Sequence, residues 1–239
     1  MTADTTEDRF LDGRLVLRQS AKGYRAGADA VLLAAAVAPA AELMEAGCGP
    51  GVALLAAATR LAAARLVGIE RDSAAVGLAR TNIEANGLVG RVSVTEGDVF
   101  EDIHTTFEGI FVNPPFATVG EGSAPRAERS GAYVTEHPLD AWIARLSNHL
   151  RGGGVLTLIH RADKTGDILA AMDGRLGAVT VYPVRPQADA PASRILVRGV
   201  KGSRAPMTLL RGIDLHDRSG AKFTPEADAI FRGHAAIDW

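Results

Sequence analysis

The strongest constraint on the fold is a near-continuous alternation of short apolar runs with longer stretches of helical periodicity. Apolar runs of strand length separated by helices are typical of βαβ units, which build a parallel sheet covered by helices on both faces. The pattern predicts an α/β fold with a Rossmann-like, seven-stranded, mainly parallel sheet. The expected strands are residues 41–46, 65–70, 92–96, 109–112, 155–160, 178–184 and 194–200.

Two of the expected helices have residues suited to their ends. Apolar residues at helical spacing follow Pro138, which suits a first turn, and Gly152 is expected to close that helix. In the tail, residues 225–232 are expected to form a short helix with Thr224 as its N-cap. Both helices are therefore predictions with defined ends.

The composition fits one domain. With 239 residues, of which 47% are hydrophobic, the chain can bury one large core, which we expect over 29–200, with extensions at 1–28 and 201–239. The formal net charge of −2 provides no global basic field, so nucleic-acid binding would need a local basic patch. The oligomeric state is left open.

The single cysteine and the hydropathy pattern bear on the compartment. A lone Cys48 excludes an intrachain disulfide and a cysteine-built metal cage, and indicates a reducing compartment. No apolar run approaches the ~18 residues of a membrane span, and the N-terminus does not resemble a signal peptide. We therefore expect a soluble, cytoplasmic protein with neither a metal nor a membrane partner.

A glycine-rich segment follows the first expected strand. The strand ends near Glu45, and Gly47, Gly49 and Gly51 precede a helix, which puts a glycine turn at the carboxyl end of a strand, where open α/β sheets bind ligands. A dinucleotide fingerprint needs glycine at the position of Val52, which disfavours a nicotinamide dehydrogenase. The spacing resembles instead the first motif of S-adenosylmethionine-dependent methyltransferases; a plain strand-to-helix turn is the alternative.

Acidic residues follow the next two strands. Glu70, at the end of the second strand, can accept hydrogen bonds from both ribose hydroxyls of a nucleoside. Asp98 follows the third strand, where methyltransferases of this class place an aspartate against the adenine amino group. Cys48 is expected to be inert despite its place in the turn. We assign to the same S-adenosylmethionine site Arg25, Ala46, Cys48, Arg71, Val99 and Asn113.

The segment Asn113-Pro114-Pro115-Phe116 follows the fourth strand. Its prolines remove two backbone donors, while the Asn113 side-chain oxygen and the Pro114 carbonyl can accept both hydrogen bonds of one NH₂ group. Phe116 offers a face for stacking a planar ring. An amino nitrogen held this way is favoured in the pyramidal form that attacks a methyl donor. These four residues are the catalytic candidates; a rigid turn with a capping Asn is the alternative.

An Asn-Pro-Pro-aromatic segment on such a fold resembles the amino-methyltransferases, which act on adenine N6 in nucleic acids or on glutamine N5 in proteins. Much of the chain is similar to the bacterial family that methylates the adenosine beside the anticodon of a valine tRNA. Departures are Ala26-Gly27, where the family usually has Phe-Ser, and Phe116 in place of Tyr. The remaining similar segments are Lys22-Gly23-Tyr24-Arg25, Asp29-Ala30-Val31-Leu32-Leu33, Arg126 with Arg129, Gly152-Gly153-Gly154, Lys201-Gly202 and Phe223-Thr224-Pro225-Glu226.

The resemblance implies adenine-N6 methylation of an RNA, with tRNA as partner. The substrate-binding candidates are Lys22, Tyr24, Arg126 and Arg129, which could grip the RNA. Three other hypotheses remain open: glutamine-N5 methylation of a protein, a non-catalytic module that binds S-adenosylmethionine or RNA, and a nicotinamide dehydrogenase. The identity of the RNA does not follow from the sequence.

Overall fold

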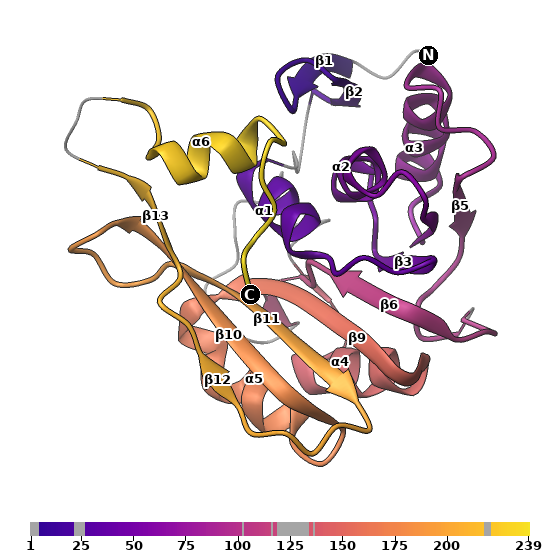
Figure 1. The fold of residues 1–239 in the computed structure, drawn as a ribbon. Helices are drawn as coiled ribbons and strands as arrows, with labels where there is room; N and C mark the ends of the chain where they lie inside the picture. Colours follow the sequence, from indigo (N-terminus) through magenta and orange to yellow (C-terminus); the bar gives the residue numbers. More distant parts are fainter. Residues whose placement is uncertain are drawn as a thin grey trace.

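A computed structural model provides the fold of the chain. It describes residues 5–21, 27–101, 103–115, 117–118, 134–135, 137–217 and 221–239. Figure 1 shows a central twisted sheet with helices above and below it.

The central sheet contains the seven expected strands and two short ones that were not predicted. Its strand order is β12-β10-β11-β9-β6-β3-β4-β5, with β13 also paired to β10. Only β11 among the long strands runs antiparallel to its neighbours. The bounds are β3 (Glu42–Ala46), β4 (Arg65–Glu70), β5 (Val92–Glu96), β6 (Phe107–Val112), β9 (Leu150–Arg161), β10 (Leu176–Gln187), β11 (Arg194–Lys201), β12 (Thr208–Leu209) and β13 (Ile213–His216).

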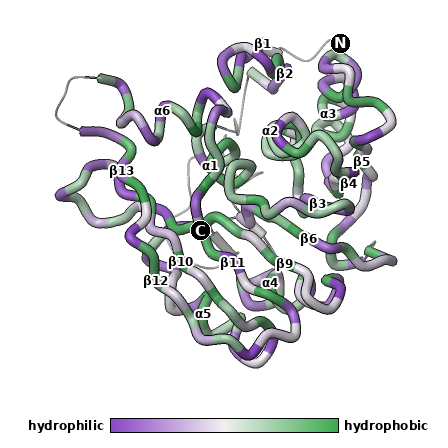
Figure 2. The backbone as a smooth tube through the Cα atoms, viewed as in Figure 1, coloured by the Kyte–Doolittle hydropathy of each residue, from purple (hydrophilic) through white to green (hydrophobic). Residues whose placement is uncertain are grey.

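Helices cover both faces of this sheet. Helices α1 (Ala28–Ala36), α2 (Val52–Arg60) and α3 (Ser73–Ala85) lie on one face, while α4 (Leu139–Asn148), the short 3₁₀ turn at Ala162–Lys164 and α5 (Thr165–Met172) lie on the other. Helices α1 and α2 are apolar along most of their length (Figure 2), because neighbouring elements cover them on several sides. None of the helices in the described ranges is long and apolar enough to cross a bilayer.

The predicted end of α4 was wrong. The helix ends at Asn148, with His149 as its C-cap, and Gly152 lies inside β9. The reason is that Leu150 already pairs with Phe107 of β6, so the chain enters the sheet before the glycines. The three glycines therefore belong to an irregular start of β9 rather than to a helix terminus.

The N-terminal extension forms a β-hairpin that the sequence did not predict. Strands β1 (Thr5–Phe10) and β2 (Leu15–Ser20) pair antiparallel, and Leu15 and Leu17 are fully buried. A two-residue parallel pair, β7 (Ala117–Thr118) with β8 (Val134–Thr135), stands apart from the central sheet.

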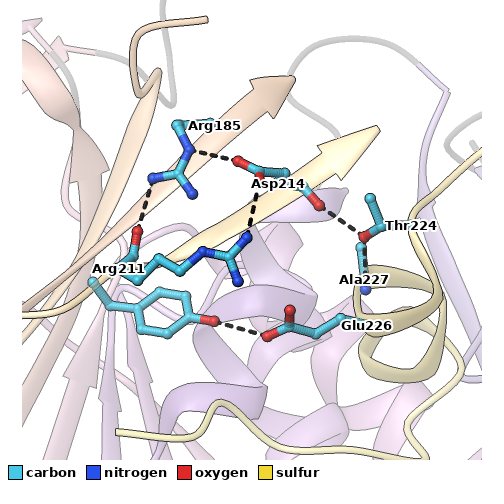
Figure 3. Close-up of polar contacts among 7 residues, drawn as sticks. Arg185, Arg211, Asp214, Thr224, Glu226 and Ala227 are labelled. Carbon is cyan, nitrogen blue, oxygen red and sulfur yellow. Dashed lines mark hydrogen bonds and ion pairs between the residues drawn. The ribbon is translucent and has the colours of Figure 1, made fainter. Parts of the chain in front are cut away.

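The C-terminal extension packs back on the core. The tail helix is confirmed as α6 (Pro225–Phe231), and its cap is made as predicted, since Thr224 Oγ1 accepts from the Ala227 N–H at 3.2 Å. Figure 3 shows the contact of Arg185 with Asp214. The Tyr182 hydroxyl donates to Glu226 Oε1 at 3.3 Å. These contacts join β10 to β13 and to α6.

Both extensions meet at the same corner of the molecule. Arg14, in the turn of the hairpin, donates to the carbonyl oxygens of Arg232 and Gly233, each at 2.7 Å. At the end of the chain, Trp239 Nε1 donates to the Ala36 carbonyl at 2.9 Å. The C-terminal extension thus packs on α1, whose residues are buried from Ala30 to Ala36.

Candidate functional site

The turns that carry the predicted site leave one edge of the sheet. Ala46, the last residue of β3, lies opposite Ile69 in β4 and opposite Val112 in β6. From β3 the chain builds outward through β4 and β5, and β6 then joins the other side of β3. The carboxyl end of β3 is therefore the topological switch point, where open α/β sheets bind ligands.

The glycine turn is open toward this edge. Gly47, Gly49 and Gly51 have φ values of 67°, 53° and 89°, the left-handed region that favours glycine. The N–H groups of Gly47 and Cys48 donate to the Ile69 carbonyl, which ties the turn to β4. A Cβ placed at Gly49 would meet no atom within 4 Å, so a ligand can approach the backbone there.

Glu70 lies at the rim of this turn. Its Oε2 accepts a hydrogen bond from the Gly49 N–H at 2.9 Å, and its Oε1 accepts one from the Asp72 N–H at 2.9 Å. A carboxylate has about four lone-pair positions, so further donors can still bind. The geometry suits an acceptor for two hydroxyl groups.

Asp98 occupies the next turn along the edge. Its Oδ1 accepts from the Phe100 N–H at 2.8 Å, and the neighbouring Gly97 N–H donates to the Glu70 carbonyl at 3.0 Å. The Asp98 turn is thereby fixed to the end of β4. Val99 beside it is buried, whereas Arg71 is exposed.

Glu45 is a buried carboxyl group at the base of the glycine turn. It is 4% exposed, and its Oε2 has no hydrogen-bond partner within the described part of the chain. Burial raises its pKa well above the ordinary value, a hydrogen bond from the Leu54 N–H opposes this, and the charge of Glu70 raises the pKa further. A positively charged ligand beside Glu45 would favour the ionised form of this carboxyl group.

Taken together, these residues fit S-adenosylmethionine. The ligand has a sulfonium and an ammonium group, and Glu45, Glu70 and Asp98 provide three carboxyl groups near the carboxyl ends of β3, β4 and β5. Glu70 would hold the ribose and Asp98 the adenine amino group.

Cys48 has the properties of an inert thiol. It is buried, and its pKa is raised well above the ordinary value first by that burial and then by the charges of Glu45 and Glu70. Nucleophilic cysteines need the opposite shift. The Sγ atom packs against Gly68 of β4, where an added Cβ would lie 2.5 Å from it.

An aromatic cluster beside the site was missed from the sequence. The Phe100 ring stacks on His137 with ring centroids 3.6 Å apart and meets the Trp142 ring edge-on at 5.2 Å. Trp142 also reaches the glycine turn, since its Cη2 atom would lie 3.9 Å from a Cβ at Gly47. In the sequence, the position of Phe100 two residues after Asp98 could have indicated an aromatic ring near the site.

The catalytic candidates begin on the residue after Val112. Pro114 is buried, Asn113 and Pro115 are partly exposed, and the Asn113 Oδ1 atom is itself buried. Because Val112 lies opposite Ala46, this segment and the glycine turn leave neighbouring strands at the same level. The predicted residues Phe116, Lys22, Tyr24, Arg25, Arg126 and Arg129 lie outside the described residues.

Comparisons with known proteins agree with this arrangement. The pattern of the methyltransferase small domain family matches residues 20–184. The tRNA1(Val) (adenine(37)-N6)-methyltransferase of Porphyromonas gingivalis is 30% identical over 202 residues, 79% of each chain. A putative protein N5-glutamine methyltransferase of Methanocaldococcus jannaschii is 29% identical over 53% of this chain and 64% of its own.

Solved structures show the same fold. A predicted O-methyltransferase from Agrobacterium tumefaciens superposes with a TM-score of 0.73 at 29% identity, over 87% of this chain and 98% of that chain. The 16S rRNA N2 G1207 methyltransferase of T. thermophilus superposes with a TM-score of 0.58 at 22% identity, over 82% of this chain and 50% of that chain, which bears on the fold alone. The resemblance inferred from the motifs is confirmed: the chain belongs to the methyltransferase small domain family and has the fold of the class I S-adenosylmethionine-dependent methyltransferases.

Proposed function

We propose that the chain transfers a methyl group from S-adenosylmethionine to the N6 amino group of an adenine in tRNA. The observation that carries the proposal is the pairing of Ala46 with Val112, which brings the glycine turn and Asn113 to adjacent strand ends. Neighbouring strands are about 4.8 Å apart, a separation that one methyl group and its two partner atoms can span. The similarity to the Porphyromonas gingivalis tRNA enzyme supports the choice of substrate.

The protein's part in the reaction is to hold the amino nitrogen. S-adenosylmethionine, when bound, supplies an electrophilic methyl group on a sulfonium. The Asn113 Oδ1 atom and the Pro114 carbonyl oxygen would accept hydrogen bonds from the two N–H groups of the amino nitrogen. Held in this way, the nitrogen lone pair would leave conjugation with the ring and be available to attack the methyl carbon. With the cofactor bound, transfer would form a nitrogen–carbon bond as the sulfur–carbon bond breaks; the electron pair of the broken bond would stay on sulfur, and one amino proton would pass to solvent. Acceptors placed where positive charge develops stabilise this transition state.

The carboxyl groups hold the cofactor in this proposal. Glu70 would accept hydrogen bonds from the ribose hydroxyls, and Asp98 would accept one from the adenine amino group. The buried Glu45 would offset the positive charge of the methionine portion. The alternative of a nicotinamide dinucleotide is disfavoured by Val52, which stands where the dinucleotide fingerprint needs its third glycine. Comparing the rise in melting temperature caused by S-adenosylmethionine and by NAD distinguishes the two cofactors.

The target adenine has to leave its stack before it can reach the methyl group. Extrusion of a base costs a few kcal/mol, least in a single-stranded loop, which favours a tRNA loop over duplex nucleic acid. Phe116 would stack on the extruded base, and Lys22, Tyr24, Arg126 and Arg129 would contact the RNA. These assignments predict binding that weakens steeply with salt.

Glutamine-N5 methylation is the alternative that the site chemistry allows. A glutamine side chain also presents an NH₂ group, and the Methanocaldococcus jannaschii relative is described as a putative enzyme of that class. The two substrates separate in one assay with labelled S-adenosylmethionine and either RNA or a peptide-chain release factor. Label in glutamine and none in RNA would select the alternative.

Asn113→Ala tests whether the chain is an enzyme rather than a module that only binds. Loss of one placed acceptor is expected to lower kcat by about a hundredfold or more, while the dissociation constant for S-adenosylmethionine stays near that of the wild type. Asn148→Ala is the matched control, because this exposed residue lies at the C-terminal end of α4. Turnover that survives in the Asn113 variant would contradict the proposed role.

A further inference from the structure

Asn82 of α3 is a fully buried polar side chain, with 0% of its surface exposed. Its Oδ1 atom accepts from the Arg18 N–H at 2.8 Å, and its Nδ2 atom donates to the Arg18 carbonyl at 3.0 Å and to the Pro50 carbonyl at 2.9 Å. Both hydrogens of the NH₂ group are therefore used. One amide thus joins three elements: α3, strand β2 of the N-terminal hairpin, and the glycine turn.

Asn86, one helical turn later, makes the corresponding pair of hydrogen bonds to the hairpin but none to the glycine turn. Its Oδ1 accepts from the Val16 N–H at 3.0 Å, and its Nδ2 donates to the Val16 carbonyl at 2.7 Å and to the Asn82 carbonyl at 2.8 Å. Residues 16 and 18 alternate along β2, so the two amides occupy its free edge as a neighbouring strand would. Asn86 donates to no residue of the glycine turn.

A hydrogen bond to the Pro50 carbonyl restrains the glycine turn where its backbone is most free to move. Pro50 has no N–H, and it stands between Gly49 and Gly51, which both have positive φ. The bond from Asn82 therefore limits how the turn can move between two permissive residues. Glu70 also holds the turn, because its carboxylate accepts a hydrogen bond from the Gly49 N–H.

We propose that Asn82 is a positioning residue that couples the N-terminal hairpin to the cofactor turn, so that hairpin docking and S-adenosylmethionine binding stabilise each other. The inference rests on the proposed function in that it takes the glycine turn as the seat of S-adenosylmethionine. Coupling between two sites is reciprocal, so the cofactor should stabilise the hairpin as much as the docked hairpin favours the cofactor.

A matched pair of variants tests the coupling. Asn82→Ala and Asn86→Ala each remove one amide from the edge of β2, but only the first removes the bond to Pro50. Calorimetry is expected to show about tenfold weaker S-adenosylmethionine binding for Asn82→Ala, the effect of losing one buried hydrogen bond, and a smaller loss for Asn86→Ala, which weakens hairpin docking but keeps the bond to Pro50. Equal affinities in wild type and Asn82→Ala would overturn the inference, and so would equal weakening in both variants.

A measurement on the wild-type protein decides the question even if Asn82→Ala does not fold. Hydrogen exchange at the Val16 and Arg18 amides is expected to slow when S-adenosylmethionine is added, by more than at the amides of β13. Bound cofactor with no preferential protection of the hairpin would overturn the coupling. Failure of the premise that the glycine turn holds S-adenosylmethionine has a different signature, because the wild type would then not bind the cofactor at all.

Discussion

The Glu70 carboxylate accepts a hydrogen bond from the Gly49 N–H, with 2.9 Å between Oε2 and the nitrogen. The end of β4 thereby shapes the turn at the end of β3. The same carboxylate also accepts a hydrogen bond from the N–H of Asp72, the N-cap residue of α3. One side chain thus orders two of the loops that surround the proposed cofactor.

Replacing Glu70 tests this dual role. Glu70→Gln keeps one oxygen for the Gly49 N–H but loses the negative charge and one acceptor, so we expect S-adenosylmethionine to bind about tenfold to a hundredfold more weakly. The melting temperature without ligand should change little, since Glu70 is partly exposed. Titration calorimetry measures the affinity, and an unchanged dissociation constant would remove Glu70 from the site.

Gly51 is expected to be intolerant of a side chain. Its φ is 89°, and an added Cβ would lie 2.6 Å from the Leu55 Cδ1 atom. Gly51→Ala should lower the free energy of unfolding by about 1–2 kcal/mol, the usual cost of placing an L-residue in the left-handed region.

Gly77 provides the control for that substitution. It lies inside α3, where an added Cβ would meet no atom within 4 Å. Gly77→Ala should raise the free energy of unfolding by up to about 1 kcal/mol through helix propensity. Urea denaturation of both variants measures the contrast, and a Gly51 variant as stable as the wild type would show that the turn is not constrained as described.

His160 predicts how stability responds to acid. The ring is buried at the end of β9, and burial is the main cause that lowers its pKa from 6.5 to about 4. Because the unfolded chain binds this proton first, the stability from the neutral ring is complete above about pH 6.5 and is lost as the pH falls toward about 4. The full loss is at most about 3 kcal/mol.

His160→Gln should remove this part of the acid sensitivity. Thermal melts of wild type and variant between about pH 7 and about pH 4 give the comparison, in which the slope matters rather than the absolute melting temperature. Parallel slopes in the two proteins would mean that His160 does not titrate in this range.

The sequence predicted the sheet well because its strands are marked by continuous apolar runs. Strands β4 and β5 have the predicted bounds, and β3 differs by one residue. The glycine spacing, Glu70 at the end of β4 and Asp98 after β5 indicated one edge of the sheet as the place of the proposed site, because parallel strands end together. Local sequence signals were sufficient wherever the determining contacts are local.

The parts that escaped prediction depend on contacts distant in sequence. The hairpin strand β2 is held by Asn82 and Asn86, which follow it by more than 60 residues, and no local pattern reveals such a partner. The stacking of His137 on Phe100 likewise joins two separate loops. The wrong end of α4 has the same cause, since the pairing of Leu150 with β6 overrode the glycine signal.

The most direct test of the account is methyl transfer itself. The wild-type protein is incubated with methyl-labelled S-adenosylmethionine and unmodified tRNA, and the RNA is digested to nucleosides and separated. The proposed function predicts label in N6-methyladenosine, with none in other nucleosides. A protein that binds S-adenosylmethionine yet leaves every adenine unlabelled would contradict it.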